Sequence, residues 1–473
     1  ITYLNLETLY IYGKEFISEE PEYKLLTFEH EAVEDLVYDF TPYNDLTTWI
    51  NYAESKGFFT GTLTGAWIPG SSTDFAVYDG GSGQGTGYIQ LELPPNYNFV
   101  EVSMRNIIVG SAHQDENKLY IDYLSNLDTS TAKLSISKGQ SVIQGFSYIP
   151  GQYLRITEEN VSLIDGNLKL TFKKTQTEYT VNFPEETECD ILIVGGGGGG
   201  GPFLGGGGGA GGVVYTVNQT LNGTYTICVG KGGIGRSLNT DDGSDAFKGV
   251  NGINSFIKNS DGSYVNMNMG GTSHNLIGLG GGGGGTYGPN LLYTGNNGGS
   301  GGGGAEKDHT GAIGGSGIQP NTLYNAETQT YIVGGSDGSA SDNSSIYFGG
   351  GGGGAGNTTN SYKNGKTGIL INITGTNQYY AAGGGGGQFM YSNFTGNNMI
   401  DISVGIGGSE IGGNGRIWNG STYIREATSG KNGTGSGGGG GAAIQDPDNP
   451  SGNGGSGIVI IRYKTQYQAT THG

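Results

Sequence analysis

Three short motifs in this sequence match patterns that bind phosphates or activate a nucleophile. An apolar run directly before the glycines of residues 195–201 matches strand-then-Gly-x-Gly-x-x-Gly, which holds a dinucleotide pyrophosphate at a helix N-terminus. Ser300 and Ser336 each lie in Gly-x-Ser-x-Gly, the turn that exposes the nucleophilic serine of esterases. Gly365-Lys366-Thr367 resembles the end of a phosphate-binding loop.

None of these motifs has the neighbours that its chemistry needs. Pro202-Phe203-Leu204 and five more glycines follow the first motif, so the helix that would hold a pyrophosphate cannot begin there. Neither serine follows a strand that turns into a helix. Asn360 stands where a phosphate-binding loop has its first glycine. We therefore expect a non-enzymatic protein with no catalytic residue and no cofactor.

Metal-binding patterns are weak. None of the five histidines stands beside a second ligand at metal-binding spacing. Two acidic loops, at 241–245 and 446–449, offer oxygen ligands for structural calcium, although neither matches the twelve-residue calcium loop and both also fit ordinary turns. Cys189 and Cys228 are too few for a four-thiolate zinc site. They are either buried free thiols or a disulfide between neighbouring strands.

The charge of the chain narrows the classes of molecule that it is expected to bind. The formal net charge is −19, which disfavours nucleic acid because phosphate binding needs clustered Lys and Arg. No run of 18 apolar residues is present, so we expect no membrane span.

Glycine is the dominant feature of the composition. The chain has 473 residues and 98 glycines, of which 83 lie after residue 180, so two regions of different construction are expected. Collagen is excluded because glycine does not recur at every third position. Apolar strand-like runs between the glycine tracts argue against simple disorder of the second region.

The first region predicts strands and one helix. Leu46, Trp49, Ile50 and Ala53 recur at helical spacing and indicate a helix over about 44–55. Alternating runs then continue to about residue 175, separated by turn signals. Short strands at this spacing predict a β-sandwich, jelly-roll-like, so the whole chain is expected to be all-β.

The second region poses a packing problem. Helix is costly for glycine, and an ordinary strand gains no side-chain packing from it. The ordered alternative is a threefold extended helix of the polyglycine II type, with about 3.1 Å of rise per residue. Several such helices can hydrogen-bond to one another through their backbones, which satisfies buried peptide groups. Flexible loops are the alternative.

The expected domains follow from these patterns. They are an extended N-terminal segment 1–28, a β-sandwich 29–178, a glycine-rich domain 179–464 bounded by short strands, and a tail 465–473. Within the first segment, residues 3–12 mix alternation with aromatic and β-branched residues, which is typical of an extended strand. We expect this strand to add to the sheet of a neighbouring subunit. The assembly-strand candidates are Tyr3, Leu4, Leu6, Leu9 and Ile11.

Several runs carry a resemblance to a known family. They are the strand 190–194 with the seven glycines after it, then 205–215, 226–233 and 454–463. They resemble the glycine-rich domain of phage and large-virus fibre and surface proteins, over about residues 180–464. In phage tail-tip adhesins, similar tracts form polyglycine II bundles whose loops contact the host. The family leads us to expect Val and Thr where Cys189 and Cys228 stand, which keeps the disulfide open.

The first region resembles β-sandwich modules beside such domains in algal-virus surface proteins. Together, the patterns and the resemblance predict a surface structural protein that self-assembles into an extracellular fibre, filament or virion surface. The alternative is an adhesin that binds host-surface glycans through glycine-rich loops or a Tyr-rich face of the sandwich. A carbohydrate-active enzyme on the sandwich is a third class, although the sequence shows no catalytic pair for it.

Overall fold

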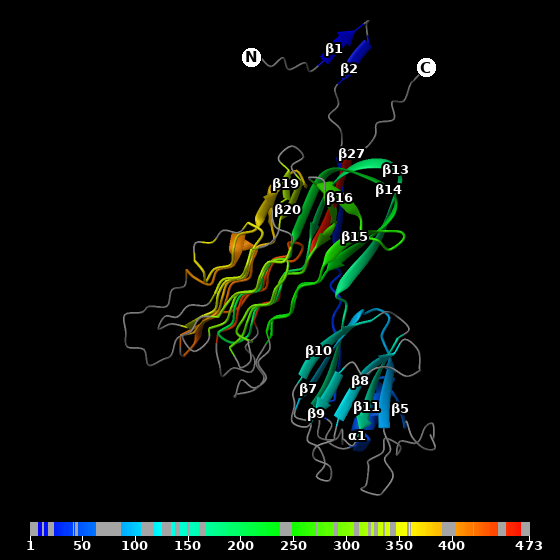
Figure 1. Cartoon of the computed structure of the whole chain (residues 1–473), viewed down its shortest axis with the longest axis vertical. Coiled ribbons are helices and arrows are strands. Elements are labelled where there is room, and N and C mark those ends of the chain that lie inside the picture. Colours follow the sequence, from blue (N-terminus) through cyan, green and yellow to red (C-terminus); the bar gives the residue numbers. More distant parts are fainter. Residues whose placement is uncertain are drawn as a thin grey trace. The chain divides into compact units, whose positions relative to one another are not determined.

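We describe a computed structural model of the chain (Figure 1). The residues that it describes are 8–11, 14–17, 23–40, 42, 46–62, 87–105, 118–124, 134–137, 142–148, 152–159, 167–236, 248–269, 272–287, 292–306, 312–319, 323–325, 330–333, 336–340, 347–356, 359, 361–389, 403–419, 421–442 and 451–464. Within this part of the chain the single α-helix is α1 (Leu46–Ser55), and the other regular elements are strands and one short 3₁₀ turn. The all-β prediction and the helix are both confirmed.

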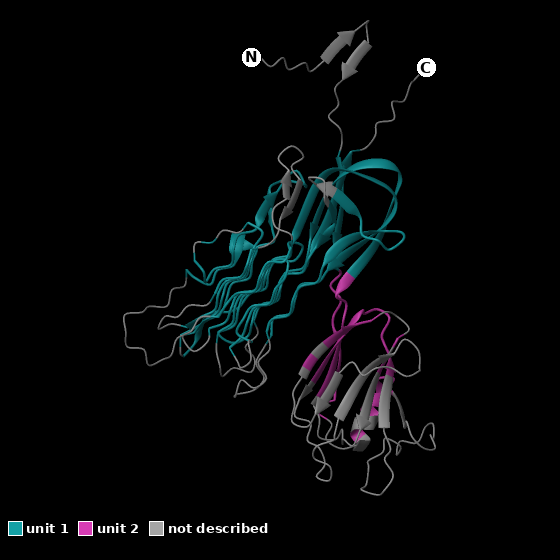
Figure 2. Cartoon of the chain, in the orientation of Figure 1, with its two compact units in different colours: residues 1–30, 177–473 teal, residues 31–176 magenta. Residues whose placement is uncertain are grey.

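The chain forms two compact units (Figure 2). Unit 1 combines residues 1–30 with 177–473, and unit 2 spans residues 31–176. Unit 2 is therefore an insertion, in sequence, between the first strands of unit 1 and the rest of it.

Unit 2 is built from two antiparallel sheets. One has the order β10-β7-β12-β4 and the other the order β5-β6-β11-β8-β9. With β5 set aside as an added edge strand, the first sheet holds the first, eighth, third and sixth strands and the second holds the rest, which is jelly-roll topology. The strands are β4 (Leu36–Asp39), β5 (Phe59–Thr62), β6 (Gly87–Glu92), β7 (Phe99–Arg105), β8 (Lys118–Leu124), β9 (Leu134–Ser137), β10 (Val142–Ser147), β11 (Tyr153–Glu159) and β12 (Asn167–Lys173).

Alternation along the strands builds the core of unit 2. Leu168, Leu170 and Phe172 are buried at every second position of β12, so they share one face. The helix adds Ala53, which is fully buried. The tyrosines of this unit whose side chains are described take part in packing: the Tyr38 and Tyr148 rings lie edge-on to Phe172, at 5.4 and 6.4 Å.

Unit 1 has a sheet of order β18-β15-β14-β13-β27-β3, to which β20 and β19 are added. β3 is its edge strand and pairs with β27 in continuous antiparallel register. Residues 23–29 therefore belong to the glycine-rich unit rather than to a free N-terminal segment. The strands are β3 (Tyr23–Glu29), β13 (Gln176–Val194), β14 (Val213–Gly230), β15 (Ser255–Asn259), β18 (Ile277–Gly278), β19 (Leu323–Asn325), β20 (Thr330–Val333) and β27 (Ile458–Lys464).

Small sheets complete the set of strands. The sheet β21-β24-β25-β26 has four strands and the others have two. Their members are β1 (Thr8–Ile11), β2 (Lys14–Ile17), β16 (Asn266–Met269), β17 (Thr272–Asn275), β21 (Tyr347–Phe348), β22 (Ile369–Ile371), β23 (Gln378–Tyr380), β24 (Gln388–Phe389), β25 (Ile417–Trp418) and β26 (Tyr423–Arg425), and the 3₁₀ turn η2 is Gly408–Glu410.

The glycine tracts leave the sheet as extended chains that run side by side (Figure 1). In the tract 195–201, every third N–H donates to the same neighbouring tract, over 2.8 to 3.0 Å. This period of three is the signature of a polyglycine II helix. The donors are Gly195, Gly198 and Gly201 to residues 206–212, Gly196 and Gly199 to residues 250–253, and Gly197 and Gly200 to residues 452–455.

Carbonyl groups of the same tract face three further neighbours. They accept N–H groups from residues 281–284, from Gly233 and from residues 438–441. Three acceptor and three donor neighbours together surround the tract completely. The tract 205–212 is enclosed in the same way, so the backbone groups at the centre of the bundle bond mainly to other backbone groups, with Ser451 Oγ, which donates to the Gly200 carbonyl, as a side-chain partner.

Glycine is required at this centre because a side chain has no space. A Cβ on Gly198 would overlap the carbonyl oxygen of Gly282, and one on Gly200 would overlap that of Gly439. Both oxygens belong to backbone that is itself hydrogen-bonded on other sides. The ordered bundle predicted from the sequence is thus confirmed, and its interior excludes Cβ atoms by contact.

We predict that Gly198→Ala lowers the free energy of unfolding by at least about 3 kcal/mol, because the new Cβ must push two tracts apart. Gly375→Ala is the matched control: Gly375 has φ +85° with open space around its Cβ position, so the change costs about 1–2 kcal/mol of backbone strain alone. Chemical denaturation of both variants measures the difference. Equal losses would show that the bundle interior is not close-packed.

Candidate functional site

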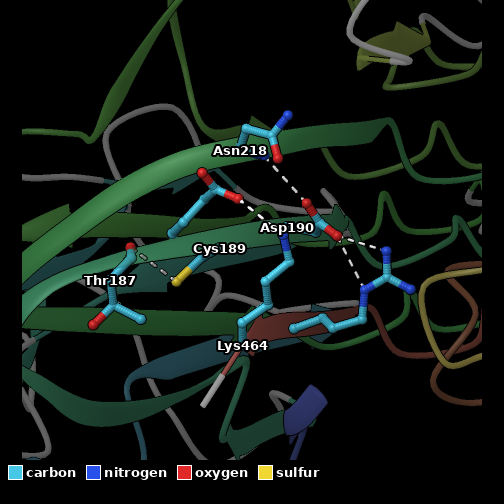
Figure 3. Close-up of polar contacts among 7 residues, drawn as sticks. Thr187, Cys189, Asp190, Asn218 and Lys464 are labelled. Carbon is cyan, nitrogen blue, oxygen red and sulfur yellow. Dashed lines mark hydrogen bonds and ion pairs between the residues drawn. The ribbon is translucent and has the colours of Figure 1, made fainter. Parts of the chain in front are cut away.

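A charged cluster joins β13, which leads into the first glycine tract, to β27, which follows the last one (Figure 3). Asp190 of β13 lies opposite Arg462 of β27 in the register. The Arg462 guanidinium donates to Asp190 Oδ2 over 3.0 Å from Nε and 2.6 Å from Nη2. The second carboxylate oxygen accepts the Asn218 backbone N–H at 3.2 Å. This cluster joins β13, β14 and β27, and all of these contacts are between strands of the same sheet.

The two cysteines lie in this region and are free, buried thiols. Cys189 packs in the hydrophobic cluster that also contains Ile227 and Val229. Cys228 stands between those two residues on β14, so strand alternation turns its side chain to the opposite face. There its Sγ lies 3.4 Å from Glu178 Oε1. The disulfide that the sequence left open does not form within the chain, because the two thiols occupy opposite sides of β14.

Both thiols are held in their protonated form. Burial raises the pKa of Cys189 to about 12, and the charges of Asp190 and Glu188 add to the effect. Burial also raises the pKa of Cys228 to about 12, with the Glu178 carboxylate as the next cause. Thiols with a raised pKa are weak nucleophiles and weak metal ligands.

The three chemical motifs of the sequence are part of the bundle. Gly195 to Gly200 form its central tract, and Ser300 is fully buried with its N–H donated to the Ala210 carbonyl. Ser336 Oγ is bonded to the backbone of Gly354. The Lys366 N–H donates to the Gly352 carbonyl. These residues are therefore placed by the glycine packing rather than by a phosphate or an esterase site.

Several expected sites lie outside the described residues. They include the calcium loops 241–245 and 446–449 and, of the assembly-strand candidates, Tyr3, Leu4 and Leu6. Leu9 and Ile11 lie in β1, which pairs with β2 in a two-stranded sheet of its own. Within the described ranges, no group of three His, Cys, Asp or Glu side chains is placed to hold a metal ion.

The structure adds a feature that sequence reasoning missed, at the end of the bundle where the tract 195–201 turns back. Each strand of the sheet β21-β24-β25-β26 places one aromatic side chain in the same row. The register pairs Tyr347 with Phe389, Phe389 with Trp418, and Trp418 with Tyr423. We call these four residues the aromatic row.

The aromatic row is partly covered. It packs against Phe203 and Leu204 of the turn between the two central tracts, and Phe389 is buried there. Tyr347, Trp418 and Tyr423 remain half-buried. Trp418 and Tyr423 have ring centroids 4.4 Å apart, and the Arg416 guanidinium lies 3.7 Å from the centre of the Tyr423 ring. Half-exposed rings beside an arginine suit stacking against a flat polar ligand as well as closing the end of the bundle.

A sequence signal for this row exists. Aromatic residues stand at or near the ends of glycine tracts, as in Tyr347-Phe348-Gly349 and Gly387-Gln388-Phe389. Because the strands are only two or three residues long, no periodicity marks them, and only the shared end of the tracts brings them together.

Comparison with protein families identifies this region. The model of a family described as "Glycine-rich domain" matches residues 174–464. No curated protein matches the sequence. Among the described residues, no helix combines the length and the apolar character needed to cross a membrane.

We predict that both thiols resist a thiol reagent in the native protein and react at once after denaturation.

The raised pKa values of the two thiols also make the stability of the fold pH-dependent: the unfolded thiols ionise near pH 9, whereas the folded ones stay protonated to about pH 12. Stability is therefore full below about pH 9 and falls as the pH rises towards 12. A Cys189→Ala/Cys228→Ala variant should lose less stability across this range. Fast native labelling, or an identical pH dependence of the variant, would contradict the assignment.

Proposed function

The chain belongs to the glycine-rich domain family, and we propose that it is a non-enzymatic structural protein of an extracellular or virion surface that assembles with copies of itself into a fibre or filament. The observation that carries this proposal is the glycine-built centre of the bundle, where backbone amides and carbonyls bond to one another. Such a centre offers rigidity, and amide and carbonyl groups are not the acids, bases or nucleophiles of enzyme catalysis.

An open sheet edge supports the assembly part of the proposal. β3 is the last strand on one side of its sheet, so one row of its backbone groups has no strand partner within the described sheet. Tyr23 and Leu25 on this strand are 47% and 43% exposed. Leu26 and Phe28, on its other face, are only partly covered by the core of unit 1. A strand added at this edge would pair the backbone and cover apolar surface on both faces.

We propose that the strand 2–12 of a second copy is the one added there. Its many aromatic and aliphatic residues match an edge that exposes apolar side chains on both faces. Each copy would carry one donor strand and one acceptor edge, which generates a head-to-tail polymer when the contact does not close into a ring.

The assembly test compares two lysine substitutions. Leu25→Lys should abolish regular polymers in electron micrographs, because a charge on the acceptor edge disfavours strand addition. Leu370→Lys is the control, since Leu370 is similarly exposed, at 47%, on the hairpin β22-β23. Deleting residues 1–13 should have the same effect as Leu25→Lys. Circular dichroism and thermal unfolding check that all variants remain folded. Polymers that persist in both the deletion and Leu25→Lys would overturn this contact.

The second candidate function is an adhesin that binds host-surface glycans, and the aromatic row is the observation that favours it. Sugar rings stack on flat aromatic faces, and three of the four rings in the row are partly exposed. As an adhesin, the bundle would be a rigid support for the aromatic row, which lies at the turn between its central tracts.

A tryptophan substitution tests the adhesin reading. Trp418→Ala should weaken binding of the labelled protein to a glycan array by roughly tenfold, a typical effect of removing a stacked aromatic ring. Tyr379→Ala is the control, because Tyr379 is an exposed aromatic on another hairpin. Equal binding by wild type and Trp418→Ala would show that the aromatic row is not part of a glycan-binding surface.

A further inference from the structure

One turn of unit 1 keeps side chains where glycine would be the easier residue. Ser409 and Glu410 have φ of 48° and 60°, and they are the only two adjacent non-glycine residues with positive φ in the described part of the chain. The other non-glycine residues with positive φ among those described, Leu204, Asn218 and Ala381, are single, and several turns use glycine, as at Gly262 and Gly375. In a chain with 98 glycines, two consecutive left-handed residues with side chains point to a use for those side chains.

The serine has a structural use and the glutamate does not. Ser409 Oγ accepts the Gly368 N–H at 3.0 Å, which ties the turn to the next tract. Glu410 is exposed, and no hydrogen bond or ion pair joins its carboxylate to any described residue. The strained backbone at this position therefore serves no internal contact that the structure describes.

Glu410 lines a cavity. The cavity has a volume of about 480 Å³ and lies between the segment 359–367 and the segment 403–410. This volume falls in the range of small-ligand pockets. Its polar lining consists of hydroxyl groups, one amide and one carboxylate, from Thr359, Asn364, Thr367, Ser403, Ser409 and Glu410.

The lining selects a ligand class. Hydroxyl and amide groups both donate and accept hydrogen bonds, as the hydroxyls of a sugar do, and a carboxylate accepts two bonds from adjacent hydroxyls. Among the described residues of the lining Glu410 is the only charged one, and its negative charge disfavours an anionic ligand. The cavity is also far larger than the oxygen cage of a single cation. Glycines 365, 407 and 408 let a ligand approach the backbone closely.

We propose that this cavity binds one or two neutral sugar units, with the Glu410 carboxylate accepting hydrogen bonds from two adjacent hydroxyls. The lining of the site contains no residue of β3 and none of the aromatic row. It therefore goes beyond the structural role and does not depend on assembly. The chain would hold a glycan on the side of its bundle while its sheet edge makes the polymer contact.

Saturation-transfer NMR on the full chain tests this site. The probes are methyl glycosides of glucose, galactose, mannose and N-acetylglucosamine, with glucuronic acid as the anionic comparison. At least one neutral glycoside should bind, and glucuronic acid should bind less. Glu410→Gln should weaken binding by about tenfold or more, because a charge-assisted hydrogen-bond pair is lost. Glu54→Gln, on the exposed face of α1, is the matched control and should bind as wild type does.

Two further variants keep the outcomes distinct. Glu410→Gly should abolish binding and raise the thermal midpoint, since glycine relieves the left-handed strain. Leu25→Lys should bind normally even where it prevents polymers, so a failure of the assembly proposal would leave this site standing. The proposal is overturned when no neutral glycoside binds, or when Glu410→Gln and Glu410→Gly both bind as wild type does.

Discussion

The backbone hydrogen bond between glycine tracts is the interaction on which the rest of unit 1 depends. In the two central tracts, N–H and C=O groups point in three directions each and meet six neighbouring tracts. Such a lattice removes water from peptide groups without leaving them unpaired, and this pairing makes the burial of so much backbone tolerable. The same lattice forbids Cβ atoms, so the composition of the region is a direct consequence of its packing. Within the tracts 195–201 and 205–212 the one Cβ belongs to Ala210, and the other side chains of the bundle lie around them.

This restriction explains where function can lie. The glycine-built centre offers no pocket, so the features with chemical character are an open strand at β3, an aromatic row where tracts turn back, and a cavity lined by Glu410 at a strained turn. The sheet supplies what the bundle lacks. Ile191, Ile193, Val459 and Ile461 pack in one apolar cluster that anchors the first and last tracts of the domain, and the Asp190–Arg462 pair joins the same two strands.

Much of this fold could be predicted from the sequence, because the signals are local. Helical spacing predicted α1 to within two residues at its start, and the alternating runs predicted up to about residue 175 lie where unit 2 has its strands. The threefold bundle followed from excluding helix and strand for glycine. The pairing of β3 with β27 was not predicted. The two strands are more than 400 residues apart, and no local sequence pattern indicates such a partner. The aromatic row and the Glu410 cavity were missed because they join segments that only the packing of the tracts brings together.

The glycine tracts form an ordered bundle held by backbone hydrogen bonds, and they are not flexible connections between strands. Amide hydrogen exchange of the native chain, followed by mass spectrometry of peptides from residues 195–212, tests it most directly. We predict that the amides of residues 195–201 and 205–212 exchange as slowly as those of β13 and β27, because each is donated to a carbonyl of another tract. Exchange of the 195–212 amides at the rate of an unstructured glycine peptide, while β13 and β27 stay protected, would contradict it.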